Sequence, residues 1–165
     1  MLQNQYVGIK LEDGIYGIDI MTIKEITEFR SITKIPNSPS FIEGIINIRG
    51  IVVPVINLKK RLHLHETEIK ENSKILIIGS DEKQVGFIVD DASQVMTLKQ
   101  TEVDSPPELI CNDGENLIVG IAKVSDKIIL LLDLIAISSE EQVNVLDQLR
   151  NHTSLNIHNK TKKVG

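Results

Sequence analysis

The sequence is poor in cysteine and in aromatic residues. Its 165 residues include one Cys, no Trp, three Phe and two Tyr. A single cysteine cannot form an internal disulfide or a multi-cysteine metal site. So few aromatic side chains cannot stack several bases or sugars. The net charge of -5 and the pI near 5.4 argue against binding to the polyanionic backbone of nucleic acids.

Long apolar runs are also missing. The longest uninterrupted one, residues 128–132, is far shorter than the roughly 20 residues needed to cross a bilayer. The first five residues contain no basic side chain, and Lys10 and Glu12 interrupt the first apolar stretch, which is unlike a secretory signal. We therefore expect a cytoplasmic protein without direct membrane insertion.

The sequence is rich in β-branched aliphatic residues. Apolar residues make up 41 % of the chain and charged residues 25 %, as in an ordinary folded soluble domain. It contains 27 Ile and 13 Val but only three Ala, which favours strands over helices. The length fits one domain or two small subdomains that share a core.

Apolar runs separated by turn residues predict a series of β-hairpins. A helix is predicted to begin at Ser138–Ser139, followed by two glutamates, and to end near Arg150. Residues 151–165 are polar, and we expect them to be mobile. The strands are predicted near residues 6–11, 15–19, 26–32, 44–48, 51–58, 75–78, 85–89, 95–98, 117–124 and 127–132.

An internal repeat relates the two halves of the chain. The hairpin around Arg49 recurs 76 positions later, where Ile118 and Gly120 correspond to Ile42 and Gly44. Pairs that match at a spacing of 69 are Gly17 with Gly86, Asp13 with Glu82, and Ile26 with Val95. Each copy has ~60 residues and about five short strands, and a sheet of that size buries its apolar face best by curling into a small barrel. Coincidence among Ile-rich strands is the alternative explanation.

The repeat predicts a mainly β fold of two five-stranded barrels side by side with a groove between them. The expected subdomain boundaries are about residues 15–72 and about 73–137, with the N-terminal strand joining the second subdomain. A C-terminal helix completes the expected architecture.

Enzyme motifs are absent. The sequence has no Gly-rich phosphate loop, no dinucleotide-binding glycine pattern and no nucleophile elbow. His63 and His65, with Glu66 and Glu68 nearby, could form a weak metal site, and a small metal-dependent enzyme is one alternative function. A polar connector is the favoured interpretation of this segment.

Four other reactive or charged positions are explained more simply. Adjacent strand residues point to opposite faces, so Asp90 and Asp91 are more consistent with a turn than with a catalytic pair. Cys111 has acidic and polar neighbours that do not activate a thiol. Arg49 lies at a hairpin tip and could pair with Glu25, although from the residues alone a solvated turn arginine is the favoured interpretation.

Residues 41–58, which read FIEGIINIRGIVVPVINL, resemble the signature of the CheW family of chemotaxis coupling proteins. Further matches lie at residues 16–20, 25–26, 36–39 and 85–90. The resemblance covers about residues 4–150, which we take as one CheW-like domain.

The resemblance implies two SH3-like barrels, no catalytic activity and no cofactor. It implies binding to the regulatory domain of the histidine kinase CheA and to the cytoplasmic tip of methyl-accepting chemoreceptors, which dock at the groove between the barrels. It places the protein at membrane receptor arrays and makes Glu25 and Arg49 an ion pair. The positions implicated in partner binding are Ile23, Glu25, Gly44, Arg49, Gly50 and Val95.

The chain departs from the family pattern at a few positions. Asn57 replaces the usual Asp, Thr27–Glu28 stands where a basic or small pair is common, and Lys74 replaces an apolar residue. These departures bear on partner preference more than on the fold. A coupling module of a related two-component pathway, or a detached half of a coupling-receiver protein, is the second alternative function.

Overall fold

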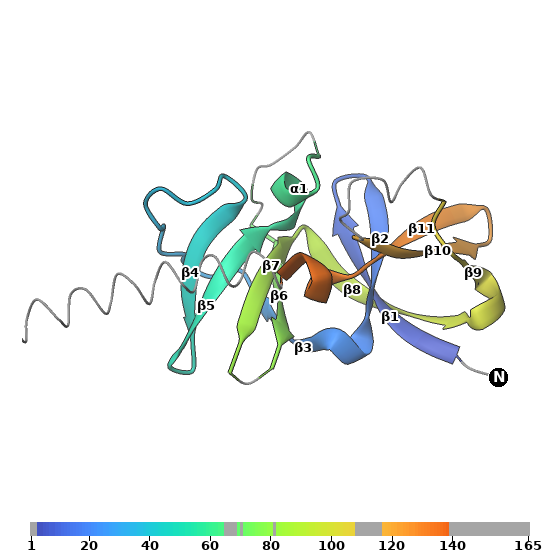
Figure 1. Ribbon diagram of the computed structural model, residues 1–165, viewed down its shortest axis with the longest axis horizontal. Helices are drawn as coiled ribbons and strands as arrows, with labels where there is room; N and C mark the ends of the chain where they lie inside the picture. Colours follow the sequence, from blue (N-terminus) through green and yellow to red (C-terminus); the bar gives the residue numbers. More distant parts are fainter. Residues whose placement is uncertain (1–2, 65–68, 70, 81, 108–116, 139–165) are drawn as a thin grey trace, which may run out of the picture.

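The computed structural model describes residues 3–64, 69, 71–80, 82–107 and 117–138. The expected helix beyond residue 138 and the polar tail 151–165 lie outside these residues. The described chain forms two sheets that lie side by side (Figure 1).

Barrel A is built on a six-stranded sheet, and barrel B on a five-stranded one. In order across the sheet, barrel A contains β8 (Asp91–Lys99), β1 (Gln3–Leu11), β2 (Gly14–Asp19), β11 (Lys127–Leu132), β10 (Ile118–Val124) and β9 (Val103–Asp104). Barrel B contains β3 (Ile23–Glu28), β6 (Lys74–Gly79), β7 (Gln84–Val89), β5 (Ile51–Asn57) and β4 (Ile42–Ile48). The short helices are η1 (Ile20–Thr22), α1 (Leu58–Arg61), η2 (Gln100–Glu102) and a helical turn at residues 134–138.

Both sheets curl until their two edges approach each other. In barrel A, the edge strand β8 continues through η2 into β9, which pairs with β10 at the opposite edge. In barrel B, the chain leaving β3 reaches Thr33, which exchanges two backbone hydrogen bonds of 2.9 and 2.8 Å with Ile45 of β4. The mainly β fold with two small barrels is therefore confirmed.

The geometry of the two halves confirms the repeat. Hairpins β4–β5 and β10–β11 carry a β-bulge at the same place, just before Gly44 and just before Gly120. Both turn with a non-glycine residue at positive φ, namely Arg49 at 49° and Ser125 at 55°. The upstream hairpins agree as well, because Gly17 pairs with Gly8 in β1–β2 as Gly86 pairs with Ile77 in β6–β7.

The two copies of the repeat exchange their first hairpins. Hairpin β1–β2 of the first copy joins β8, β10 and β11 in barrel A, while β6–β7 of the second copy joins β3, β4 and β5 in barrel B. The barrels therefore divide the chain differently from the expected boundaries near residues 15, 72 and 137, which put β2 with the first subdomain and β6–β7 with the second. Sequence similarity shows which segments are alike, but it does not show which copy each hairpin pairs with.

The largest apolar cluster lies between the barrels, and each barrel has a smaller core of its own. Strand β6 serves two of these cores, because Ile75 and Ile77 point into barrel B while Leu76 and Ile78 point toward barrel A. We call the shared cluster the inter-barrel core: Val7, Ile9, Leu11, Ile18, Ile42, Ile56, Leu58, Leu76, Ile78, Val85, Phe87, Val89, Leu132, Leu134 and Ile137. A shared core of this size makes the two barrels one folding unit.

A helical turn at residues 134–138, which was not predicted, precedes the expected helix. Asp133 caps it, accepting a hydrogen bond of 3.0 Å from the Ala136 N–H, so Ser138 lies inside the turn instead of capping it. Asn57 caps α1 in the same way by accepting from the Lys60 N–H at 3.3 Å. Asn57 and Asp133 are equivalent in the repeat, so the Asn57 cap would have pointed to the start of this turn.

Candidate functional site

The tip of hairpin β4–β5 presents the main candidate side chain. Arg49 and Gly50 form the turn with φ of 49° and 87°. The Gly50 N–H donates a hydrogen bond of 2.7 Å to Asn47 Oδ1, which closes the turn from the last part of β4. Glycine tolerates the positive φ at position 50, and the Asn47 side chain closes the turn, so this local sequence holds Arg49 in a defined place.

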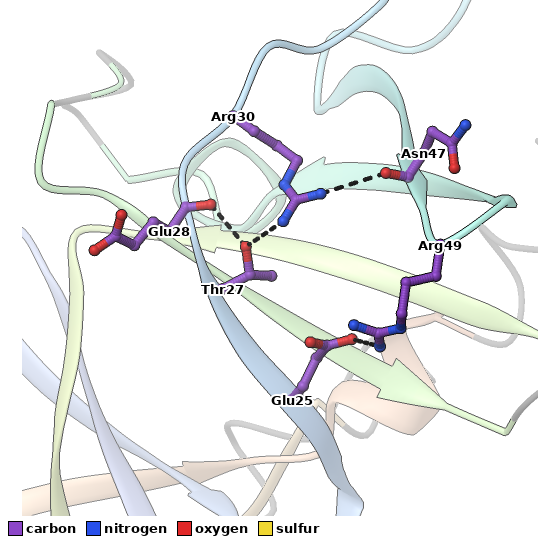
Figure 2. Close-up of polar contacts among 6 residues, drawn as sticks. All are labelled: Glu25, Thr27, Glu28, Arg30, Asn47 and Arg49. Carbon is purple, nitrogen blue, oxygen red and sulfur yellow. Dashed lines mark hydrogen bonds and ion pairs between the residues drawn. The ribbon is translucent and has the colours of Figure 1, made fainter.

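Arg49 forms an ion pair with Glu25 on β3, through Nη2 and Oε1 (Figure 2). The Arg49 side chain is 71 % exposed and the Glu25 side chain 28 % exposed. An exposed ion pair adds only about 0–1 kcal/mol to stability. Its effect is to orient a guanidinium at the surface, with donors left to face a partner.

A second arginine lies beside this pair. Arg30 donates through Nη1 to the Asn47 backbone oxygen and through Nη2 to Thr27 Oγ1, both at 3.3 Å (Figure 2). The Thr27 hydroxyl in turn donates to the Glu28 backbone oxygen at 2.8 Å. Sequence reasoning missed Arg30 and Asn47, because no motif shows that residue 30 returns to the end of β4.

The residues that depart from the family pattern form contacts with other charged or polar residues of the chain. Glu28 and Lys74 are partners in the β3–β6 register, with Nζ and Oε1 3.9 Å apart. Asn57 is fully buried and donates through Nδ2 to Glu43 Oε1 at 3.2 Å, which a carboxylate at position 57 could not do.

The structure brings only some of the expected binding residues together. Glu25, Arg49 and Gly50 meet at one end of barrel B, while Gly44 lies toward the other end of β4. Ile23 opens β3 and packs against the inter-barrel core. Val95 lies on β8 of barrel A and is exposed, so the set extends over both barrels.

Exposed apolar side chains occur on both barrels. Val95 and its repeat equivalent Ile26 are both exposed, as are Val52 and its equivalent Ile128. Aliphatic side chains exposed on strands can supply apolar contact area for a protein partner.

The other sequence candidates form no reactive centre in the described part of the chain. His63 is exposed just after α1, while His65, Glu66, Glu68 and Cys111 lie outside the described residues. Among the residues that are described, no cluster of three His, Cys, Asp or Glu could hold a metal ion. Asp90 forms an ion pair with Lys59, and Asp91 accepts a hydrogen bond from the Ala92 N–H, so the two carboxylates serve different contacts.

The described helices include none with the length and apolar character of a membrane span.

Comparison with known proteins gives consistent similarities. A family model described as a CheW-like domain matches residues 5–142. Chemotaxis protein CheW of Treponema pallidum (strain Nichols) is 33% identical over 151 residues, covering 89% of each chain. Chemotaxis protein CheW of Bacillus subtilis (strain 168) is 36% identical over 126 residues, 76% of this chain and 81% of the relative. The crystal structure of the scaffolding protein TtCheW from Thermoanaerobacter tengcongensis has a TM-score of 0.75 and 36% identity, covering 82% of this chain and 92% of that one.

Proposed function

The chain belongs to the CheW family, and from this premise we propose that it is a non-enzymatic adaptor that couples methyl-accepting chemoreceptors to the histidine kinase CheA. The observation that carries the proposal is the match to CheW proteins across both barrels, residues 5–142. The adaptor acts in the cytoplasm, at arrays of membrane receptors, and places the kinase under receptor control.

The surface chemistry supports binding to two protein partners. A receptor tip is a helical hairpin, and apolar grooves bind the apolar stripe of such helices. Exposed aliphatic side chains on both barrels supply apolar contact area, and the oriented guanidinium of Arg49 supplies specificity. Many modest interfaces in one array act together by avidity, so no single contact has to be tight.

We assign partner binding to six residues, which act in different ways. Ile23 and Val95 supply apolar contacts, Glu25 and Arg49 supply the oriented ion pair, and the glycines supply backbone shape. Those glycines are Gly44, at the bulge of β4, and Gly50, in the turn next to Arg49.

Co-sedimentation with receptor-containing membranes tests this function directly. The protein is expected to pellet with membranes that contain chemoreceptors and to increase the amount of CheA that pellets with them. Membranes without receptors are the control. Recovery of neither the receptors nor the kinase with this protein would count decisively against the coupling function.

Replacing Arg49 with alanine is expected to weaken coupling without unfolding the protein. Because the Arg49–Glu25 pair is exposed, the free energy of unfolding should change by less than about 1 kcal/mol. Receptor-dependent kinase activity should fall roughly tenfold or more, as for an arginine at the centre of an interface. The measurements are urea denaturation and CheA autophosphorylation with receptors present.

Two variants separate the possible roles of Arg49. Arg30→Ala removes the neighbouring guanidinium and leaves the Arg49–Glu25 pair intact, so it is the matched control. The charge exchange E25R/R49E restores an ion pair with reversed polarity. Recovery of kinase stimulation in the exchanged protein would show that Arg49 acts through its ion pair with Glu25, which ties the hairpin tip to β3. Continued loss would show that the Arg49 guanidinium contacts a partner protein directly. Unchanged stimulation in Arg49→Ala excludes both roles.

A further inference from the structure

A buried ion pair lies where the two barrels meet. Lys59 Nζ is 2.8 Å from Asp90 Oδ1, and the two side chains are only 2 % and 6 % exposed. Lys59 belongs to α1, which follows β5 of barrel B. Charged side chains are rarely buried to this extent unless they are paired, as these two are.

Asp90 occupies the crossing point between the barrels. It is the residue between β7 of barrel B and β8 of barrel A. Its Oδ2 accepts a hydrogen bond of 2.7 Å from the Glu12 N–H, and its own N–H donates to the Lys10 oxygen at 2.9 Å. Lys10 and Glu12 belong to β1 and the β1–β2 turn, in barrel A. One aspartate therefore joins α1 of barrel B to the first hairpin of barrel A.

The pair is not a product of the internal repeat. The position equivalent to Lys59, 76 residues later, is Ile135, and the position equivalent to Asp90, 69 residues earlier, is Met21. Both are apolar, and they are 48 % and 87 % exposed. The ion pair thus has no counterpart at the equivalent positions of the other repeat copy. This indicates that the pair serves a need specific to its own place between the barrels.

Stability alone does not explain such a pair. The cost of removing two charges from water nearly cancels their attraction, and apolar replacements of both partners are often neutral or stabilising. Apolar contacts across the inter-barrel core are non-directional and specify relative orientation weakly. Hydrogen bonds and ion pairs have fixed directions, and their best-established use in a core is to select one register.

We propose that the Lys59–Asp90 pair, with the Glu12 amide, fixes the orientation of barrel A relative to barrel B. The two residues are positioning residues, which hold the inter-barrel surface in one arrangement for its partners. That the pair fixes the orientation does not depend on the proposed function. That this orientation matters for partner binding does rest on the proposed function.

Distances between spin labels on the two barrels test the orientation. Labels at exposed positions, V52C on β5 and T97C on β8, report the inter-barrel distance in a C111S background. The unaltered Lys59–Asp90 pair is expected to give one narrow distance distribution. K59M/D90L, which removes both charges, is expected to broaden or shift it. An unchanged distribution in the folded double variant overturns the proposal.

The matched control is K60M, at the next residue. It removes the ion pair between Lys60 and Glu43, which are 2.9 Å apart and both belong to barrel B and its helix α1. Because this pair does not cross between the barrels, K60M should leave the distance distribution unchanged. Equal broadening in K60M and K59M/D90L would show a general loss of order and would contradict the specific role of Lys59 and Asp90.

Hydrogen exchange on the unaltered protein provides a test that needs no variant. If the link persists in the native state, the Glu12 amide should exchange as slowly as the amides of β6, an interior strand of barrel B. Fast exchange at Glu12, beside protected β6 amides, shows that the link opens in the native protein and overturns the proposal even if K59M/D90L fails to fold.

Binding measurements distinguish this inference from the proposed function. With receptor tips, K59M/D90L is expected to bind roughly tenfold more weakly than the unaltered chain, within the usual range for coupling between a conformation and a ligand. D90E, which keeps the charge pair, should recover part of the affinity. If the unaltered protein binds no receptor, the proposed function fails, while the label distances still decide the role of the pair. Full receptor affinity in K59M/D90L would show that the orientation of the barrels has no role in receptor binding.

Discussion

Replacing Phe87 with alanine is expected to lower the free energy of unfolding by about 3–5 kcal/mol. Phe87 is fully buried in the inter-barrel core. It lies on β7 between Leu76 of β6 and Ile56 of β5, which are its partners in the strand register. Loss of the Phe87 ring would leave a cavity between the two barrels, where several elements meet and few can move to fill it. Since whole domains are stable by only about 5–15 kcal/mol, a large part of the protein's stability would be lost.

Urea denaturation followed by circular dichroism measures this loss. The matched control is Phe29→Ala, because Phe29 is exposed just after β3. Its replacement should change the free energy of unfolding by less than about 1 kcal/mol, as is usual for surface positions. A single cooperative transition is expected for each variant, since the shared core joins the barrels. Separate unfolding of the two barrels, or equal costs at Phe87 and Phe29, would contradict the role assigned to the inter-barrel core.

Replacing Gly44 with alanine is expected to cost about 2–4 kcal/mol, through backbone strain and lost hydrogen bonds. Gly44 has a φ of 147°, which side chains rarely adopt, and an added Cβ would lie 2.0 Å from the Thr33 backbone oxygen. Thr33 exchanges hydrogen bonds with Ile45, and this bridge brings the two edges of barrel B together. The alanine methyl group would push Thr33 away and open the barrel at this point.

Gly50→Ala separates the two causes of the Gly44 effect. Gly50 also has a positive φ, of 87°, but an added Cβ there meets no atom within 4 Å. Its replacement should therefore cost only the conformational term, about 1 kcal/mol. Thermal unfolding of both variants checks the difference. Equal losses at the two glycines would mean that the contact with Thr33 does not matter, and protection of the Thr33 amide from hydrogen exchange would then be unaltered in Gly44→Ala.

Local patterns predicted most of the strands because they depend on neighbouring residues. The alternation of apolar side chains and the turn residues located four hairpins, among them β4–β5 with its Arg49–Gly50 turn. The helical turn at residues 134–138 was not predicted, because the cap signal at Ser138 and Ser139 drew attention to a helix after them. Asp133, five residues before Ser138, accepts from the Ala136 N–H and begins the turn.

The candidate site was only partly predictable, for the same reason. The hairpin pattern suggested that Arg49 could pair with Glu25, and the family resemblance made this ion pair the favoured interpretation, which the structure shows. Arg30 was missed because its contacts depend on the path of a loop between two strands. Asp90 was interpreted as a turn residue, whereas its burial depends on Lys59, which is far from it in the sequence.

By itself, the sequence determined the strand content, the two-fold repeat and the family, because these follow from residue type and order along the chain. Only the tertiary structure decided which copy each hairpin joins, and where Asp90, Lys59 and Arg30 find their partners. Two similar copies offer almost equal local pairings. The choice between them comes from burying both faces of β6 and β7 at once, which depends on all of the packed segments together.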